Sequence, residues 1–508
     1  MKATAQHVVV IGYGPVAARL IEGLLPAVRC GDLALTVIGE EGAAAYNRVL
    51  VADLGVGRTT AAAMNVSDPA ELVAAGVAVH LAARVLRVDR ARQGVLLADG
   101  TWIHYQQLVF ATGARPVIPT LHGLNPDPAA HAPLPAGVIA LRDLDDAAVL
   151  RSAVERHAHV VVLGGGILGL EAALAARDEG AQVTVVHHGA HALGRSIDAG
   201  AGHTVAAALR ARGIKVVAKA RAVGVDLRPG PGGGAAFAAL LQEDGDPVAG
   251  DLLLLSCGVR PRVEVAAGAG LATDRGILVD HQLRAHHDPQ VFAVGDCAHI
   301  RCLDAGCPDC AAGTGPAGLI GPGWRQAEWL AGFLGGGAAP APLPPEQAAV
   351  MMLKARGVDV AAAGEVAAGP FDDVPGQQVS VWADPEHGKY VKMTTRAGVL
   401  AGFISVGMPR TGAELTLLFE RGSELPADRS ALLRLDGPDA AGALGGAGTD
   451  PGRTVCRCAG ISAGAVLSAV AGGCASVPEV SAATRAGTGC GGCHGALQEL
   501  IEAHFAPV

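Results

Sequence analysis

Four cysteines near the end of the chain have a spacing that could support chemistry. Cys456 and Cys458 form a C-x-C pair, and Cys490 and Cys493 form a C-x-x-C pair after 31 intervening residues. Two such pairs can be disulfides, a zinc site, a redox dithiol or an iron–sulfur cluster, because thiols or thiolates serve all of these. The rest of the chain has to discriminate among them.

Composition and charge narrow the class of protein. The chain has 508 residues, half of them hydrophobic, and a net charge of −9 without a basic block. A nucleic-acid partner is therefore not expected. The first residues lead directly into a short apolar strand without a signal-peptide pattern, and no apolar run reaches the roughly 18–20 residues of a membrane span. We expect a cytoplasmic protein, in which structural disulfides are disfavoured.

A glycine-rich unit lies near the start, in "HVVVIGYGPVAARLIEGLL". The pattern predicts a buried strand, a turn and a helix. Gly12 permits the tight turn, and Gly14 lets the backbone approach a pyrophosphate at the helix N-terminus. The next strand, "LALTVIGEE", leads to Glu40, whose carboxylate could accept hydrogen bonds from a ribose. Such glycine-rich turns also occur as plain structural turns.

The unit is repeated in "HVVVLGGGILGLEAALAARDEGAQVTVVHHG", with "LVFATGARP" before it and "PQVFAVGDCAH" after it. Over about residues 5–335, these four motifs in this order resemble the flavoprotein disulfide reductase superfamily with two dinucleotide-binding domains. The resemblance implies an α/β fold of two nested Rossmann-like domains, the first binding FAD and the second NAD(P)H.

The resemblance also implies the cofactor-binding residues. Those that it assigns to FAD are Gly12, Gly14, Glu40, Ala111, Thr112, Gly113, Arg115, Gly295 and Asp296. Those that it assigns to the nicotinamide nucleotide are Gly164, Gly166 and Gly169. Asp296 is expected to accept hydrogen bonds from hydroxyls of the ribityl chain.

Two positions of the second unit have alternative interpretations. Its second strand ends at His187 and His188, with no acid for a ribose and no adjacent arginine for a 2′-phosphate; the nearest is Arg195. This favours NADH over NADPH, although histidines that merely end a strand explain the pattern too. Glu171 matches a carboxylate near the nicotinamide in related flavoenzymes, which makes it the candidate catalytic residue. It is equally explained as an acid placed favourably near a helix N-terminus.

The predicted flavin region lacks the thiols of the disulfide reductases. Cys30 is the only cysteine before Cys257, and "AAAYNRVLVAD" has no cysteine where single-thiol relatives carry one. The segment "YNRVL" instead resembles the flavoprotein portion of NAD(P)H-dependent nitrite reductases and the electron-transfer subunits of assimilatory nitrate reductases. Asn47 and Arg48 would then border the flavin or its pyrophosphate; an ordinary turn with a solvated arginine is the alternative.

The cysteine quartet could hold the group that accepts electrons from the flavin. Together with "AGTGCGGC" leading into a helix, it resembles the bacterioferritin-associated-ferredoxin-like (BFD-like) [2Fe–2S] domain. The four thiolates match the ligand complement of such a cluster. Zinc binding by the same four residues is the alternative that spacing leaves open.

A second group of cysteines follows the expected flavin aspartate. Cys297, Cys302, Cys307 and Cys310 lie within fourteen residues, and the last three have C-x₄-C-x₂-C spacing. The spacing is similar to that of plant-type ferredoxins. Three interpretations stay open, which are a zinc site, a second iron–sulfur cluster, or loop thiols with Cys297 beside the flavin.

The predicted domains follow these motifs. They are an FAD-binding domain in two parts (1–120 and 265–338), an NAD(P)H-binding domain (121–264), a small α+β interface-like domain (345–435) and a short helical [2Fe–2S] domain (452–508). "GGGAAPAPLPPEQ" and "LDGPDAAGALGGAGTDPG" are predicted linkers, and the second is expected to tether a mobile cluster domain.

The resemblance implies an NAD(P)H-oxidising flavoprotein that passes single electrons through the cluster to a partner. That partner is expected to be the catalytic subunit of assimilatory nitrate reductase, or a nitrite reductase. The chain ends about fifteen residues after Cys493, so we expect it to lack the sirohaem domain of longer nitrite reductases. A stand-alone NAD(P)H oxidase, a rubredoxin or ferredoxin reductase, and a cluster-based redox sensor are the alternatives.

Overall fold

The computed structural model describes most of the chain. The described residues are 5–124, 134–230, 233–304, 306–307, 310, 315–316, 318–336, 342–343, 349–355, 357–436, 451–452, 454–456, 459–488 and 493–505. Cys458, Cys490 and much of both predicted linkers, including the expected mobile tether, lie outside them. No helix in these ranges is both long and apolar enough to span a bilayer.

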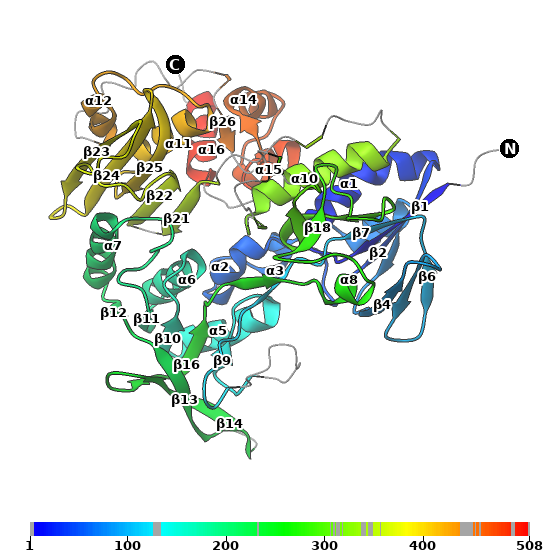
Figure 1. Cartoon of the computed structure of the whole chain (residues 1–508), viewed down its shortest axis with the longest axis horizontal. Helices are drawn as coiled ribbons and strands as arrows, with labels where there is room; N and C mark the ends of the chain where they lie inside the picture. The colour runs from blue at the N-terminus through cyan, green and yellow to red at the C-terminus, as the bar shows by residue number, and fades with distance from the viewer. Residues whose placement is uncertain are drawn as a thin grey trace.

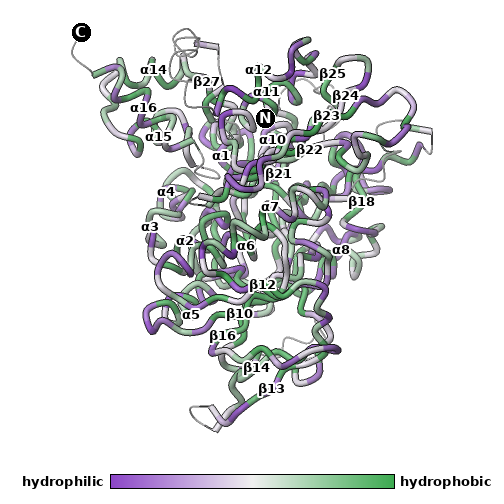
Figure 2. Tube along the Cα trace, turned by 90° about the vertical axis from the view of Figure 1, so that its left-hand side faces the viewer, coloured by the Kyte–Doolittle hydropathy of each residue, from purple (hydrophilic) through white to green (hydrophobic). Residues whose placement is uncertain are grey.

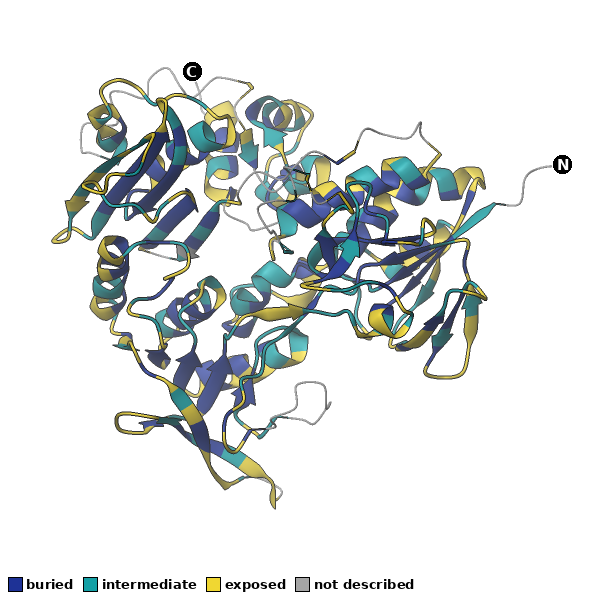
Figure 3. Ribbon diagram, viewed as in Figure 1, coloured by how far each residue is buried: buried dark blue, intermediate teal, exposed yellow. Residues whose placement is uncertain are grey.

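The first sheet contains five parallel strands in the order β19-β7-β1-β2-β3. Its strands are β1 (Gln6–Ile11), β2 (Leu33–Ile38), β3 (Ala78–His80), β7 (Gln107–Phe110) and β19 (Val291–Ala293). The centre of this sheet is buried on both faces (Figure 3), which explains the continuous apolar run of β1. Helix α1 (Pro15–Cys30) follows β1, and α10 (Ile320–Leu334) packs against α1.

The second sheet repeats this arrangement in the order β12-β11-β10-β16-β9, again with parallel neighbours. Its elements are β9 (Val138–Ile139), β10 (His159–Leu163), α6 (Ile167–Asp178), β11 (Gln182–Val186), α7 (Ala199–Ala211), β12 (Lys215–Val217) and β16 (Leu252–Leu255). All of them fall between β7 and β19 in the chain, so the second unit is inserted into the first. The predicted pair of nested Rossmann-like folds is confirmed.

Smaller sheets complete and connect these units. The remaining elements before α10 are α2 (Val51–Gly55), α3 (Ala61–Met64), α4 (Pro69–Ala74), β4 (Val85–Asp89), β5 (Gly94–Leu97), β6 (Trp102–His104), β8 (Ala114–Pro116), α5 (Leu144–Glu155), β13 (Ala222–Pro229), β14 (Ala235–Gln242), β15 (Val248–Ala249), β17 (Val259–Pro261), α8 (Glu264–Gly268), β18 (Ile277–Val279) and β20 (Ala298–Ile300). Strands β8 and β17 pair where the chain enters and leaves the second unit. The β13–β14 hairpin projects from it (Figure 2).

An antiparallel sheet of order β21-β22-β25-β24-β23 covers the second unit. Its elements are β21 (Met351–Ala355), β22 (Val358–Gly364), β23 (Gln377–Asp384), β24 (Lys389–Arg396) and β25 (Val399–Val406), followed by α11 (Pro409–Glu420) and α12 (Ser430–Leu433). The alternating segment "YVKMTTRAGVLAGFISVG" predicts a hairpin that turns at "RAG", and this is the β24–β25 turn. Lys392, only 1% exposed, donates to an Asp198 carboxylate oxygen at 2.9 Å and to Val366 O at 2.7 Å.

The last part of the described chain forms a small helical unit with its own core. Its elements are β26 (Thr454–Cys456), β27 (Ile461–Ser462), α14 (Ala463–Ala471), α15 (Val477–Thr484) and α16 (His494–Phe505). This unit lies beside α1 and α10 (Figure 1). Arg485 forms an ion pair with Glu22 of α1, and Asn47 Nδ2 donates to Thr488 O at 2.7 Å. The structure therefore docks the cluster domain on the first nucleotide-binding unit.

Candidate functional site

A cavity of about 990 Å³ lies between the two nucleotide-binding units. This volume is at the upper end of the usual range for ligand sites. The predicted residues among its lining are Gly12, Gly14, Glu40, Arg48, Ala111, Thr112, Gly113, Arg115, Gly295 and Asp296. Leu168, Leu255 and Ser256 of the second unit line the same cavity. It therefore lies where the two units meet, although Gly164, Gly166 and Gly169 are not among its lining residues.

The glycines at the β1–α1 turn fit a pyrophosphate. Gly12 has φ +107°, and a Cβ there would lie 2.2 Å from Ala111 O, so a side chain is excluded. Gly14 is the N-cap of α1 without a side-chain capping bond, and a Cβ there would meet nothing within 4 Å. The backbone thus leaves open space in front of a helix N-terminus, where N–H groups and the helix dipole favour a phosphate.

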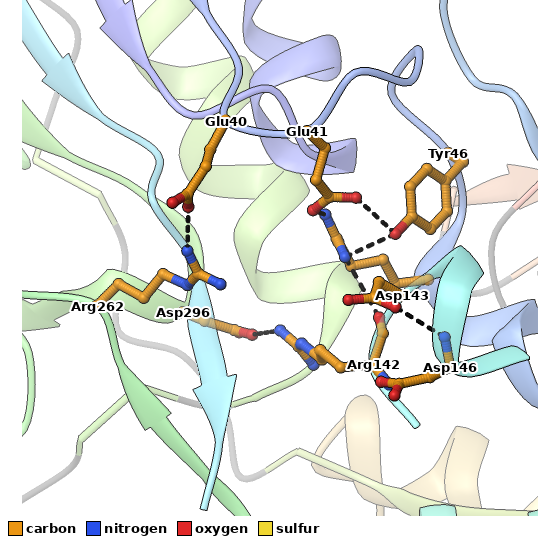
Figure 4. A network of polar contacts seen from close by, with 9 residues as sticks. Glu40, Glu41, Tyr46, Arg142, Asp143, Asp146, Arg262 and Asp296 are labelled. Carbon is orange, nitrogen blue, oxygen red and sulfur yellow. Dashed lines mark hydrogen bonds and ion pairs between the residues drawn. The ribbon is translucent and has the colours of Figure 1, made fainter. Parts of the chain in front are cut away.

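Two carboxylates face cationic partners within this cavity (Figure 4). Glu40, just beyond β2, accepts a hydrogen bond from Arg262 at 2.5 Å. Asp296 lies 3.5 Å from the guanidinium of Arg142. Burial lowers the pKa of Arg142, and the charge of Asp296 opposes this effect. Our sequence interpretation missed both arginines, because Arg142 follows β9 of the inserted unit and Arg262 follows β17 on the return to the first unit, and neither lies in a recognised motif.

The "YNRVL" segment forms part of the cavity wall. Arg48 donates to Tyr46 Oη at 2.8 Å and to Arg142 O at 3.3 Å, and it forms an ion pair with Glu41. Burial alone would raise the pKa of Glu41, but Arg48 and Tyr46 outweigh it and lower that pKa. Arg48 is therefore held in a network and is not the solvated arginine of a plain turn. Asn47 is buried and lies directly behind this wall.

No cysteine is among the described residues that line the cavity. Cys297 is buried beneath it, where its Sγ donates to Val294 O at 3.2 Å and to Phe110 O at 3.3 Å. Burial raises the pKa of Cys297, and burial raises the pKa of Cys257 to about 11. Thiols with raised pKa values are poor nucleophiles, so neither of the two is suited to thiol redox chemistry.

The turn of the second unit has the same geometry as the first. Gly164 has φ +125°, and a Cβ there would lie 2.1 Å from Ser256 O. Gly166 is the N-cap of α6 and faces open space. At Gly169, a Cβ would lie 2.9 Å from Gly164 O, so this glycine lets the helix pack closely on the turn. Glu171 is half-buried on α6 and is not among the cavity-lining residues.

The end of β11 differs from the end of β2. His187 is buried, and its Nε2 has no hydrogen-bond partner among the described residues. Burial lowers the pKa of His187, so its imidazole is neutral near pH 7. His188 is exposed. Neither residue supplies the carboxylate that usually binds a ribose at this position.

The described half of the cysteine quartet fits an iron–sulfur cluster. Cys456 and Cys493 are both buried in the core of the helical unit. The N–H of Gly487 donates to Cys456 Sγ at 3.5 Å, and α16 begins directly after Cys493. Such N–H donors stabilise thiolate charge. Outside the cavity, Cys302, Cys307 and Cys310 gather around His281, which our sequence interpretation did not include.

Comparisons with known proteins agree with this geometry. The profile of the pyridine nucleotide-disulphide oxidoreductases matches residues 6–317, and that of the BFD-like [2Fe-2S] binding domain matches residues 454–503. A ferredoxin reductase structure from Rhodopseudomonas palustris is 26% identical with a TM-score of 0.68, covering 85% of this chain and 100% of that one.

The sequence relatives fall into two groups. Nitrite reductase [NAD(P)H] from Bacillus subtilis is 26% identical over 98% of this chain and 57% of its own length. The assimilatory nitrate reductase electron transfer subunit of that species is 26% identical over 98% and 59%, respectively. The chain thus spans little more than half the length of these relatives. The ferredoxin–NAD(+) reductase component of the anthranilate 1,2-dioxygenase system from Burkholderia cepacia is 35% identical over 58% and 68%.

The cofactors follow from the two profiles and from the fit of the residues. The first profile implies FAD and NAD(P)H, and the second implies a [2Fe–2S] cluster in the helical unit. The chain belongs to the pyridine nucleotide-disulphide oxidoreductase family, and it is an NAD(P)H-dependent flavoprotein with an appended [2Fe–2S] domain.

Proposed function

We propose that this protein takes electrons from NADH and delivers them, through its own [2Fe–2S] domain, to a separate reductase. The proposed partner is the catalytic subunit of assimilatory nitrate reductase. The observation that carries the proposal is the contact between the cluster domain and the wall of the flavin cavity.

That contact is a short chain of hydrogen bonds. The N–H of Gly487 donates to Cys456 Sγ at 3.5 Å, and the carbonyl of the next residue, Thr488, accepts from Asn47 Nδ2 at 2.7 Å. Asn47 also accepts the N–H of Val49 at 3.1 Å, which fixes its side chain. Arg48 and Val49 line the cavity. The path from the proposed cluster ligand Cys456 to the cavity wall therefore crosses two hydrogen bonds, with only short stretches of covalent bonds between them.

The cofactors supply a change in electron number: a nicotinamide delivers two electrons as a hydride, a flavin accepts both, and a [2Fe–2S] cluster accepts one at a time. The residues of the chain bind and orient these groups. We propose that Gly12, Gly14 and Glu40 hold the FAD pyrophosphate and ribose, and that Asp296 holds the ribityl chain. Glu171 is proposed to act near the nicotinamide, although it lies outside the cavity lining in this structure.

NADH is the proposed donor because neither His187 nor His188 offers the fixed cation that a 2′-phosphate requires. We expect a higher kcat/KM for NADH than for NADPH with a dye acceptor. An NADPH preference of about tenfold, worth 1.4 kcal/mol, would contradict this assignment.

The nitrate and nitrite reductase relatives match almost the whole chain, including the cluster domain, which favours a partner in nitrogen-oxide reduction. A second candidate is a ferredoxin reductase, favoured by the 35% identity of the nucleotide-binding part to such a component. The docked cluster domain favours the first candidate, because a one-electron carrier that belongs to the chain itself would then lie beside the flavin cavity.

The experiment replaces one cluster ligand in the full chain. Cys456→Ser should leave NADH-dependent dye reduction by the flavin intact and reduce NADH-dependent nitrite formation, with purified nitrate reductase catalytic subunit, to background. The control is Cys474→Ser, a cysteine of the same domain that packs beside the core and is not a proposed ligand. Equal nitrite formation by Cys456→Ser and wild type would refute the relay. No nitrite with wild type, together with rapid reduction of an added ferredoxin, would support the second candidate.

A second variant tests the contact itself. Asn47→Asp keeps the oxygen that accepts from Val49 but loses the donor to Thr488. Because one well-made hydrogen bond contributes about 1–1.5 kcal/mol, the docked population should fall up to about tenfold. Stopped-flow absorbance should show slower reduction of the cluster after the flavin. An unchanged rate would remove this contact from the proposal.

A further inference from the structure

The paired strands β18 and β20 bring two residues of the second cysteine group together. The two strands are parallel, and Val279 is opposite Ile300. His281 and Cys302 each come two residues after these partners, so they leave the same edge of the sheet side by side. The N–H of Arg301 still donates to Val279 O at 2.8 Å, which holds the two chains together just before these residues.

The ligand atoms of four residues converge at this edge. One atom each from His281, Cys302, Cys307 and Cys310 lies within 4.8 Å of all the others. His281 Nε2 is 3.4 Å from the Sγ atoms of both Cys307 and Cys310. The Sγ atoms of Cys302 and Cys310 are 3.6 Å apart. All four residues are half-buried.

These separations fit a single tetrahedral ion. With Zn–S near 2.3 Å and Zn–N near 2.0–2.1 Å, a tetrahedron has S···S edges of about 3.8 Å and S···N edges of about 3.6 Å. A [2Fe–2S] cluster divides its ligands between two irons and would hold the two pairs farther apart. Thiolate and imidazole ligands select zinc over magnesium or calcium. The geometry thus separates interpretations that the cysteine spacing leaves open.

The surrounding backbone holds the ligands in place. The N–H of Cys302 donates to Cys310 Sγ at 3.2 Å, which is the type of bond that supports a thiolate ligand. On the other loop, an Asp280 carboxylate oxygen accepts the N–H groups of Gln282 at 2.7 Å and Arg284 at 3.0 Å, and so fixes the turn that carries His281.

We propose that His281, Cys302, Cys307 and Cys310 bind one Zn²⁺ in a structural site. Four protein ligands complete the tetrahedron and leave no open position for a substrate, as in structural zinc sites. The ion joins the loop after β18 to the segment that connects β20 with α10. Leu319 and Ile320, at the start of α10, line the flavin cavity. The zinc site therefore anchors the segment that leads into one wall of that cavity.

The test is metal analysis of the full chain purified with its flavin. About one zinc per chain is expected, in addition to iron, because four-ligand sites retain zinc strongly near pH 7. Cys307→Ser and His281→Ala should each lower the zinc content at least about tenfold. The control Cys30→Ser removes an exposed cysteine far from the site in sequence and should keep the zinc.

Two further measurements keep the proposal falsifiable if a variant folds poorly. Cys493→Ser should keep the zinc, whereas loss of zinc in that variant would place the ion at the C-terminal quartet and overturn the proposal. Wild-type chain exchanged with Co²⁺ should show the thiolate charge-transfer and tetrahedral d–d bands. Any of three results would overturn the proposal. The first is a wild-type chain that has no zinc and shows no cobalt bands, the second is a disulfide between Cys302 and Cys310, and the third is loss of iron and sulfide from Cys307→Ser.

Discussion

The two nucleotide-binding units share a turn and differ at the end of their second strand. Gly12 and Gly164 both have positive φ, and a Cβ at either would lie about 2 Å from a carbonyl oxygen of the neighbouring strand connection. Glu40, in contrast, is exposed and paired with Arg262, while His187 is buried and its Nε2 has no hydrogen-bond partner in the part of the chain that the structure describes. The shared turn follows from backbone geometry alone, whereas the strand end is where we propose that selectivity for the nucleotide arises.

The units also differ in the ion pairs that hold their packed elements together. The inserted unit is joined to the antiparallel sheet by the buried Lys392–Asp198 pair. The FAD unit joins α1 to α10 by the pair of Arg19 and Glu328, whose side chains are 20% and 50% exposed. A buried pair and a solvated pair are expected to respond very differently to the loss of one charge.

The largest effect is expected at the buried pair. Lys392→Met leaves the Asp198 carboxylate without its cation and should cost about 3 kcal/mol of unfolding free energy. Glu328→Gln is the matched change at the exposed pair and should cost less than about 1 kcal/mol. Thermal unfolding of both variants measures the difference. Equal shifts in Tm would show that the two ion pairs do not differ as described.

Substitution of the first glycine in each of the two turns should affect a different cofactor. Gly12→Ala should lose FAD and with it all NADH oxidation, whereas Gly164→Ala should stay yellow and lose reduction by NADH at least about 100-fold, or about 2.7 kcal/mol. Flavin absorbance per chain and dye reduction provide the readouts. Gly332→Ala in α10, where a Cβ meets nothing within 4 Å, is the control. If Gly164→Ala also lost its flavin, the two sites would not be separate.

The acid at the end of β2 should affect only the first nucleotide. Glu40→Gln replaces a charged acceptor by a neutral one and should weaken FAD binding about tenfold, since hydrogen bonds to charged groups contribute about 1.5–3 kcal/mol. Apoprotein titrated with FAD gives the affinity. Glu155→Gln, on the surface of α5, should leave it unchanged. An unaltered affinity in Glu40→Gln would remove this residue from the FAD site.

The smallest effect is expected at His187 and depends on pH. Burial lowers its pKa, so below the ordinary value of about 6.5 the unfolded chain binds more protons than the folded one. The buried neutral imidazole therefore contributes fully to the free energy of unfolding above a pH of about 6.5, and this contribution is lost as the pH falls below that value. His187→Gln should flatten this part of the Tm profile and keep FAD bound. A variant profile parallel to that of wild type between pH 5 and 7 would contradict the buried neutral state.

Local patterns predicted much of this fold. The apolar runs of β1 and β10, with glycines directly after them, predicted both strand–turn–helix units, because these rules act within about twenty residues. The turn at "RAG" predicted the β24–β25 hairpin for the same reason. Arg142, Arg262 and His281 could not be predicted, since pairings between distant segments bring them to their sites.

The position of the cluster domain against the first unit could not be predicted from the sequence, for the same reason. The cysteine spacing and the resemblance indicated its ligands, and the linker composition suggested a free tether. The contact between Asn47 and Thr488 joins residues 441 positions apart, and no local pattern reports such a contact. Polar surface residues that recognise a second domain have the same composition as solvated ones.

The insertion of one unit into the other has a consequence for synthesis on the ribosome. Strands β9 to β16 are contiguous, so the inserted unit can fold as soon as it has emerged. The FAD sheet must wait for β19, which pairs with β7 only after about 180 further residues have been added. Until then β7 is an open edge that carries Leu108 and Phe110, and such edges invite pairing with other chains. The edge of β7 is therefore exposed to wrong pairing until the second half of the flavin domain has been synthesised.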